Sequence, residues 1–307
     1  MNYIQFHIRM SLTILYGTKE NRREVTYICL TQLNKNNIIT IPAGDIARSS
    51  YFGDHLVGIV KKVFIILNGN ETEHIQNYSI TINLGDYTLS TPMNLNAIDE
   101  KLNNIHRNLK IKHGSLRDEF PEQKMAVSYL TGNEKVLEIG GNIGRNSLVI
   151  ASIVNNNNFV SLETDSKIAK QLEENRDLNN FTFHIENSAL SKRKLIQRGW
   201  DTIPSDVLKE GYFWVNTVTI EQLKEKYKIP FDTLILDCEG AFYYILMDMP
   251  EILNGINTII MENDYHDIRH KSFVDSTLKE NNFYNCYREA GGWGCCYSNF
   301  FEVWKRI

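Results

Sequence analysis

The first part of the chain, up to about residue 92, consists of short runs of apolar, β-branched or aromatic residues separated by turn residues. Such runs are typical of β-strands, because branched and aromatic side chains suit a pleated, half-buried surface. Turn signals at Asn68-Gly69-Asn70 and Gly85-Asp86 fit hairpins. We therefore expect a small β-rich domain over residues 1–92, with room for one helix near 29–33 and strands over residues 3–15, 25–28, 38–41, 57–67 and 78–84.

The pattern becomes helical after Thr91-Pro92. Apolar residues then recur every three or four positions, which places on one face of an α-helix the side chains of Leu95, Ile98, Leu102, Ile105 and Leu109. We expect this helix to belong to a linker over residues 93–119 that joins two domains.

From Phe120-Pro121 onward, helical segments alternate with apolar, strand-like segments. This alternation predicts an α/β domain over residues 120–307, in which a Rossmann-like parallel sheet has helices on both faces. The expected strands cover residues 135–139, 159–162, 182–185, 233–237 and 258–262, with a last strand at 299–305. The expected helices cover residues 122–130, 145–154, 166–176, 220–227, 241–249 and 273–280.

Composition and charge narrow the classes of partner. The chain of 307 residues is 42% hydrophobic and 23% charged, with a net charge of −4, so we expect neither a nucleic-acid nor a membrane partner. The apolar run over residues 56–67 is interrupted by Lys61 and Lys62 and is shorter than the roughly 20 residues that cross a bilayer. The five cysteines are scattered without metal-ligand spacing, and residues 1–15 lack a signal-peptide pattern, which favours reduced thiols and a cytoplasmic protein.

The sharpest motif is a glycine-rich turn at residues 135–144, Lys-Val-Leu-Glu-Ile-Gly-Gly-Asn-Ile-Gly. Gly140 and Gly144 allow the backbone to turn sharply and approach a ligand, and Asn142 belongs to the few residue types that tolerate positive φ. The helix that follows presents free N–H groups. Glu138 at the strand tip would repel a pyrophosphate but suits a cofactor that carries an ammonium and a sulfonium.

A second acid follows the next strand. Glu163 lies roughly 20 residues beyond the last loop glycine, where nucleotide-binding sheets place the acid that binds ribose hydroxyls. The two acids together favour S-adenosylmethionine over a nicotinamide cofactor, whose G-x-G-x-x-G fingerprint is absent. A nicotinamide-dependent oxidoreductase is the alternative from another enzyme class, and a plain βα turn with capping acids is the alternative without a ligand.

Five segments resemble, in order, the motifs of the FkbM-type methyltransferases: residues 136–144, Ser161-Leu162-Glu163-Thr164-Asp165, residues 175–179, Asn187-Ser188-Ala189-Leu190 and Leu236-Asp237-Cys238-Glu239-Gly240-Ala241. The resemblance spans residues from about 120 to the C-terminus and implies a class I fold, S-adenosylmethionine as cofactor, and O-methylation, often of sugar or polyketide hydroxyls. It implies that the ribose contacts Glu163, the adenine Ser188 and Ala189, and the methionine end Glu138, Gly140, Asn142 and Gly144. Class I sheets also commonly close with an antiparallel edge strand, which we expect at 299–305.

The chain departs from the family pattern at four positions. Glu138 replaces the usual Asp, Gly141 the usual Ala and Cys238 the usual Val, and these changes are sterically mild. Phe242 replaces the usual closing Glu. This last change removes one carboxylate from the acceptor side, where a base or metal role would otherwise be inherited.

The N-terminal part resembles a small β module found on glycan-processing enzymes of giant viruses. The residues that carry this resemblance are Asp45, Tyr51-Phe52-Gly53-Asp54 and residues 56–62. It implies a role in acceptor binding or in assembly of a homo-oligomer. A purely structural cap is the alternative.

Candidate catalytic residues follow two strands of the predicted sheet, at the edge where open α/β sheets bind ligands. Asp237 could serve as a general base or a metal ligand, and Glu239 could do the same or cap the following helix. Glu262 and His266 follow the next strand, and a neutral imidazole with an ordinary pKa of about 6.5 could accept a hydroxyl proton. A loop histidine is also often a surface residue, and these residues leave the participation of a divalent metal open.

Methyl transfer from a sulfonium mainly requires alignment of the acceptor with the methyl carbon and exclusion of water, so few catalytic residues are needed. We therefore expect an O-methyltransferase that acts on a hydroxyl of a sugar, nucleotide sugar or glycan precursor. The alternative outside enzymology is an inactive methyltransferase-fold protein that binds glycans or serves in assembly. Phe242 and the added β domain favour that alternative.

Overall fold

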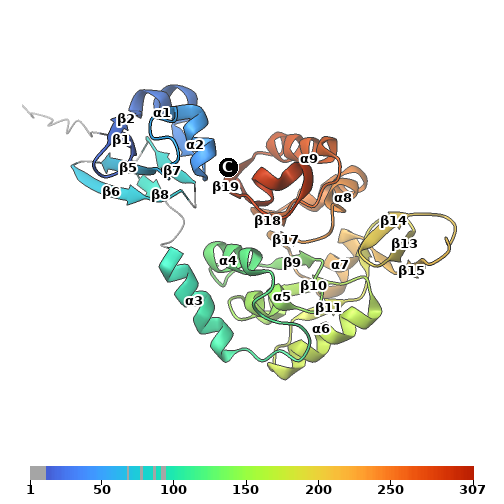
Figure 1. The fold of residues 1–307 in the computed structure, drawn as a ribbon. Coiled ribbons are helices and arrows are strands. Elements are labelled where there is room, and N and C mark those ends of the chain that lie inside the picture. The colour runs from blue at the N-terminus through green and yellow to red at the C-terminus, as the bar shows by residue number, and fades with distance from the viewer. Residues whose placement is uncertain (1–11, 68, 77–78, 86–87, 91–94) are drawn as a thin grey trace, which may run out of the picture. The chain divides into compact units, whose positions relative to one another are not determined.

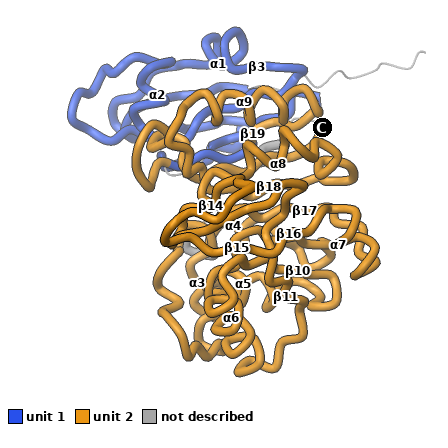
Figure 2. The backbone as a smooth tube through the Cα atoms, turned by 90° about the vertical axis from the view of Figure 1, so that its right-hand side faces the viewer, with its two compact units in different colours: residues 1–92, 286–289 blue, residues 93–285, 290–307 orange. Residues whose placement is uncertain are grey.

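The computed structural model describes residues 12–67, 69–76, 79–85, 88–90 and 95–307 (Figure 1). The chain forms two compact units (Figure 2). Unit 1 comprises residues 1–92 and 286–289, and unit 2 comprises residues 93–285 and 290–307. Residues 93–119, which we expected to form a linker, thus lie in unit 2.

Unit 1 contains two antiparallel four-stranded sheets, with the orders β2-β1-β5-β6 and β3-β4-β7-β8. The first is formed by β1 (Leu12–Gly17), β2 (Arg22–Glu24), β5 (Lys62–Leu67) and β6 (Asn70–His74). The second is formed by β3 (Asn34–Lys35), β4 (Ile38–Ile41), β7 (Ile80–Asn83) and β8 (Thr88–Ser90). Alternate side chains of these strands form one core with, among others, Ile14, Tyr16, Ile39, Ile41, Val63, Ile65, Ile80 and Ile82.

Two predictions for unit 1 are wrong. The expected strand at 25–28 is the start of helix α1 (Thr26–Gln32), where the buried Thr26 hydroxyl accepts a hydrogen bond from the Ile14 amide at 2.8 Å. The strand expected at 57–67 begins only at Lys62, because buried Lys61 forms ion pairs with Asp45 and Asp54 at 3.1 and 2.8 Å. Helix α2 (Asp45–Phe52) was not predicted. Residues 3–11 and 78 of the expected strands lie outside the described residues.

Unit 2 is built on a sheet with the order β11-β10-β9-β17-β18-β20-β19, although residues 286–289 of the edge strand β19 are assigned to unit 1. The strands β9, β10, β11, β17 and β18 are parallel and β20 is antiparallel to β18. Their bounds are β9 (Val136–Ile139), β10 (Phe159–Leu162), β11 (His184–Glu186), β17 (Thr233–Leu236), β18 (Thr258–Glu262), β19 (Phe283–Glu289) and β20 (Phe301–Arg306). The predicted Rossmann-like α/β fold with an extra β-rich region is confirmed.

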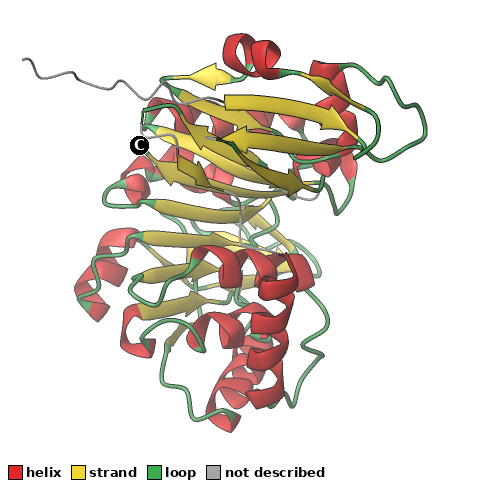
Figure 3. Cartoon of the chain, turned by 90° about the vertical axis from the view of Figure 1, so that its left-hand side faces the viewer, coloured by secondary structure: helices red, strands yellow, loops and turns green. Residues whose placement is uncertain are grey.

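Helices flank this sheet (Figure 3). They are α3 (Leu95–Asn108), α4 (Phe120–Tyr129), α5 (Arg145–Ala151), α6 (Ser166–Leu178), α7 (Ile220–Tyr227), α8 (Phe242–Asp248) and α9 (Ile268–Glu280). Short 3-10 turns occur at Asn156–Asn158, Pro250–Leu253 and Gly294–Asn299. In the part of the chain that the structure describes, none of the helices is long and apolar enough to cross a membrane.

The end of the chain and one insertion differ from the prediction. Strand β20 is antiparallel as expected, but it lies between β18 and β19 and is therefore not the edge of the sheet. Helix α9 starts at Ile268 rather than 273, because Asp267 caps it by accepting the Arg269 amide at 2.9 Å. Between β11 and α7, the chain forms five further strands that were not predicted: β12 (Ala189–Leu190), β13 (Leu195–Arg198), β14 (Asp201–Pro204), β15 (Phe213–Val215) and β16 (Thr217–Val218).

Candidate functional site

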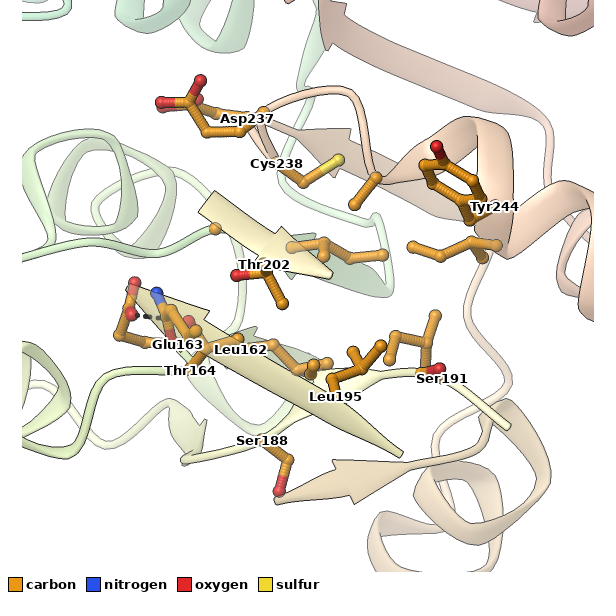
Figure 4. Close-up of a pocket in the computed structure, with 18 of the residues that line it drawn as sticks. Leu162, Glu163, Thr164, Ser188, Ser191, Leu195, Thr202, Asp237, Cys238 and Tyr244 are labelled. Carbon is orange, nitrogen blue, oxygen red and sulfur yellow. Dashed lines mark hydrogen bonds between the residues drawn. The ribbon is translucent and has the colours of Figure 1, made fainter. Parts of the chain in front are cut away.

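A pocket of about 300 Å³ lies at the carboxyl ends of the parallel strands of unit 2. Its lining includes Ile139, Leu162, Asp237 and Glu262, which end or directly follow β9, β10, β17 and β18. In Figure 4, Asp237 and Cys238 lie on one side of the pocket, and Leu162, Glu163 and Thr164 lie on the other. The pocket therefore occupies the edge where open α/β sheets bind ligands.

The glycine-rich turn forms one wall of the pocket. Gly140 and Asn142 both line it and both have positive φ, 96° and 47°. A Cβ on Gly140 would lie only 1.6 Å from the carbonyl oxygen of Asp237, so this position excludes every side chain. Gly144, with φ 94°, precedes α5 and is not among the lining residues. The turn thus brings bare backbone to the pocket, as its sequence predicts.

Glu138 lies beneath the turn and does not line the pocket. Its carboxylate accepts hydrogen bonds from the hydroxyls of Ser147 and Ser161, both at 2.5 Å, and the residue is only 2% exposed. Burial raises the pKa of Glu138 from 4.5 to about 7, against the opposing effect of the two hydroxyls. We expected Glu138 to line the methionine end of a cofactor, whereas in the structure its side chain lies outside the pocket lining and binds Ser147 and Ser161.

We expect Glu138→Gln to be more stable than the parent at pH 8, with a smaller difference at pH 5. The folded-state pKa of about 7 lies above 4.5, so the folded chain loses stability as pH rises through this range, and glutamine cannot ionise. The difference in unfolding free energy between the two proteins should grow by about 2–3 kcal/mol from pH 5 to pH 8. Urea unfolding at both pH values measures it, and an equal difference at both would show that Glu138 does not titrate this way.

Glu163 reaches the pocket with both carboxylate oxygens already oriented. Oε2 accepts the amide of Asn142 at 2.9 Å, and Oε1 accepts the amide of Asp165 at 2.8 Å. Burial raises the pKa of Glu163 while these two N–H donors lower it. Oε1 also accepts the Thr164 hydroxyl at 3.4 Å, whereas Oε2 retains a second lone pair that can accept a hydroxyl hydrogen from a ligand in the pocket.

Ser188 and Ala189 also line the pocket, directly after β11. Beyond them, the unpredicted β13 and β14 present one face to the same cavity. Leu195 pairs with Pro204 and Gln197 with Thr202, and all four side chains belong to the lining. Cross-strand partners share a face of a sheet, so this hairpin covers the pocket with a mixed apolar and polar surface.

Three of the four predicted catalytic residues line the pocket: Asp237, Glu239 and Glu262. Glu239 adopts a left-handed backbone conformation (φ 50°) in the sharp turn after β17 and is exposed. His266 is exposed and is not among the lining residues; its ring packs against Trp293, with 4.6 Å between centroids. Strand β18 thus ends with an acid in the pocket, Glu262, whereas His266 in the segment after β18 lies outside the pocket lining.

The structure adds three acids that were not predicted. Glu119 and Glu122, at the start of α4, line the pocket next to Asp237 and Glu262, and buried Asp264 lies close by. Glu119 is bound by Arg145 at 2.6 Å. Burial raises the pKa of Asp237 well above its usual range, that of Glu262 to about 11 and that of Asp264 to about 7, with neighbouring carboxylates adding to each shift. One end of the pocket therefore holds several carboxyls that ionise readily only beside a positive charge.

Comparisons with family models find no match, and no curated protein is similar in sequence. Solved structures with a similar trace include an O-methyltransferase from Bacillus cereus in complex with SAH (16% identity, 69% of this chain and 91% of that chain, TM-score 0.39). They also include a ribosomal protein L11 methylase from Lactobacillus delbrueckii subsp. bulgaricus (10% identity, 64% of this chain and 83% of that chain, TM-score 0.41). A third is a protein of the NADB-Rossmann superfamily from Streptococcus agalactiae (11% identity, 60% of this chain and 67% of that chain, TM-score 0.38). Values this low leave the function to be argued from the pocket itself.

Proposed function

We propose that this chain is an S-adenosylmethionine-dependent methyltransferase that methylates a hydroxyl of a sugar or glycan precursor. The observation that carries the proposal is one continuous pocket with a bare-backbone turn, an oriented carboxylate at Glu163 and a cluster of acids at its far end. The turn and Glu163 suit the methionine and ribose parts of the cofactor, and the acids suit the acceptor.

Glu163 would bind one ribose hydroxyl through the free lone pair of Oε2, and the second ribose hydroxyl would replace the long Thr164 hydrogen bond at Oε1. Ser188 and Ala189 would contact the adenine, and the turn at Gly140 and Asn142 would accept the methionine end. The sulfonium and ammonium of this cofactor are positive, whereas a dinucleotide carries a negative pyrophosphate. The acidic pocket attracts the first and repels the second, which favours S-adenosylmethionine over a nicotinamide cofactor.

In the reaction, the acceptor oxygen attacks the methyl carbon in line with the C–S bond. The C–O bond forms, the C–S electron pair passes to sulfur, and S-adenosylhomocysteine leaves as a neutral thioether. The hydroxyl proton must leave as well, and Asp237 is the pocket-lining carboxylate at the tip of the central strand β17 that is placed to take it. His266 lies outside the pocket lining, so we assign it no proton transfer.

Several features suit a sugar acceptor. Carboxylates that line a pocket accept hydrogen bonds from vicinal hydroxyls, and Asp237, Glu239 and Glu262 offer such acceptors at one end. Tyr244 and Trp200 also line the pocket, and aromatic rings pack against the apolar faces of sugar rings. Unit 1 would contribute acceptor binding or homo-oligomer assembly.

Methyl-labelled cofactor and a panel of monosaccharides, nucleotide sugars and glycans test the proposal. We expect label in an O-methylated sugar, and we expect Asp237→Asn to lower kcat by about 10²–10⁴ with little change in affinity for S-adenosylhomocysteine. Asp177→Asn, at an exposed acid of α6, is the matched control and should keep parental turnover.

Two outcomes would contradict the proposal. Parental turnover in Asp237→Asn, together with a large loss in His266→Gln, would assign proton transfer to His266. Full cofactor binding with no transfer to any sugar would favour a glycan-binding or assembly protein that has lost activity.

A further inference from the structure

Three carboxylates converge at the acidic end of the pocket in unit 2. Asp237 follows β17, Glu262 ends β18, and Asp264 comes two residues later. One oxygen from each lies within 4.8 Å of the oxygens of the other two. In the described part of the chain, none of the three forms an ion pair with a lysine, arginine or histidine.

A fourth acid supplies a second, independent observation that points to a ligand at this cluster. Glu122 comes from a different element, the first turn of α4, and is only 8% exposed. Its Oε2 is buried and has no hydrogen-bond partner among the described residues. Glu122 and Glu262 line the same pocket and are close enough to interact, and two ionised carboxylates offer each other acceptors only, where a donor or a cation is needed.

A group of four adjacent carboxylates, of which Asp264 and Glu122 are buried and Asp237 and Glu262 partly buried, cannot remain fully ionised without a compensating positive charge. Protonation of some of these acids is one way to remove the charge. A bound cation is the other way, and it leaves the acids ionised. An all-oxygen set of this kind suits hard divalent cations, which prefer carboxylate ligands to nitrogen or sulfur.

We propose that Asp237, Glu262, Asp264 and Glu122 form a binding site for a divalent cation, Mg²⁺ or Mn²⁺. Cation binding does not depend on the proposed methyl transfer and should occur in the chain without any cofactor. Its consequence for the acceptor does rest on the proposed function: a cation here would present open coordination positions to two adjacent hydroxyl oxygens, which favours a diol acceptor over an isolated hydroxyl.

The test is a titration of the purified full chain with Mn²⁺ at pH 7.5, without cofactor, in which electron paramagnetic resonance measures free Mn²⁺. We expect one saturable site per chain, from which Mg²⁺ displaces Mn²⁺. Glu122→Gln and Glu262→Gln should each weaken Mn²⁺ binding at least tenfold. Glu239→Gln is the matched control, because this acid lines the same edge but lies outside the cluster, and it should change affinity less than twofold.

A second readout covers variants that bind weakly because they fold poorly. Mg²⁺ should raise the Tm of the parent. In Glu122→Gln and Glu262→Gln, Mg²⁺ should raise the Tm by less. Without metal, we expect the Tm of both variants to equal or exceed the parental Tm, because each variant removes an acid from the cluster. The proposal is overturned by absence of saturable Mn²⁺ binding in the folded parent. It is equally overturned by parental affinity in both cluster variants, or by a tenfold loss in Glu239→Gln alone.

Discussion

Replacing Gly140 by alanine should cost the protein more than about 4 kcal/mol of unfolding free energy and abolish binding of S-adenosylhomocysteine. The added Cβ would meet the Asp237 carbonyl oxygen at 1.6 Å, and φ at this position is 96°. Relief would require β9 and β17 to separate, because Gly140 and Asp237 directly follow these paired strands. Chemical unfolding and calorimetry measure the two losses.

Gly255→Ala is the matched control for that prediction. Gly255 has a similar φ of 86°, but a Cβ there would meet only the Phe231 carbonyl oxygen, at an ordinary 3.6 Å. Gly255→Ala should lower the unfolding free energy by about 1–2 kcal/mol, because alanine disfavours the left-handed conformation, and it should retain cofactor binding. Equal losses in the two variants would show that the clash at the turn is relieved by local movement.

Replacing Glu163 by alanine should weaken binding of S-adenosylhomocysteine by about 1.5–3 kcal/mol, roughly 10- to 150-fold in Kd. The change removes both acceptors for the ribose hydroxyls and also frees the Asn142 amide, which holds the turn against Glu163. Isothermal titration calorimetry measures the change.

Glu186→Ala is the control for this second prediction, since Glu186 ends the neighbouring strand β11 but does not line the pocket. Its Oε2 accepts hydrogen bonds from Lys226 and Tyr227 on α7, and its Oε1 accepts a long one from the Ser188 hydroxyl at 3.5 Å, so we expect at most a small loss in this variant. An unchanged affinity in Glu163→Ala, or an equal loss in Glu186→Ala, would refute the ribose assignment.

The parts of unit 2 that could be predicted are those that depend on the pattern of residues close together in the sequence. Each parallel strand is a continuous apolar run, and each is followed by a helical segment, so the alternation alone predicts the sheet. Strand β19 was missed because its sequence, Phe-Tyr-Asn-Cys-Tyr-Arg-Glu, buries only Phe283 fully and shows no apolar run. The hairpin at β13 and β14 was missed for a related reason, because each strand has only four residues and the turn between them is flanked by charged Arg198 and Asp201 and carries exposed Trp200.

In unit 1, tertiary contacts overrode local preference. The run from Val25 to Ile28 has strand-forming residue types, yet it enters α1 because the Thr26 hydroxyl and the Cys29 side chain are buried against β1. The helical conformation of this segment thus depends on contacts with a strand about twelve residues earlier in the chain, and the local sequence pattern does not include those contacts.

The same distinction holds for the pocket. The turn at Gly140 and the acid at Glu163 follow from one strand–turn–helix motif and from its spacing to the next strand, so both could be predicted. Glu122 could not, because an acid in the first turn of a helix is usually explained by the helix dipole, and only the packing of α4 brings it to Glu262. His266 shows the converse: the residue type suits a base, but side-chain direction after β18 takes it to Trp293.

A calorimetric titration of the full chain with S-adenosylhomocysteine, and separately with NAD, tests the central claim most directly. We expect one site per chain for S-adenosylhomocysteine, lost or strongly weakened in Glu163→Ala, and no saturable heat with NAD, since the acidic pocket repels a pyrophosphate. Saturable binding of NAD together with no binding of S-adenosylhomocysteine would contradict the assignment of this pocket to a methyl-donor cofactor.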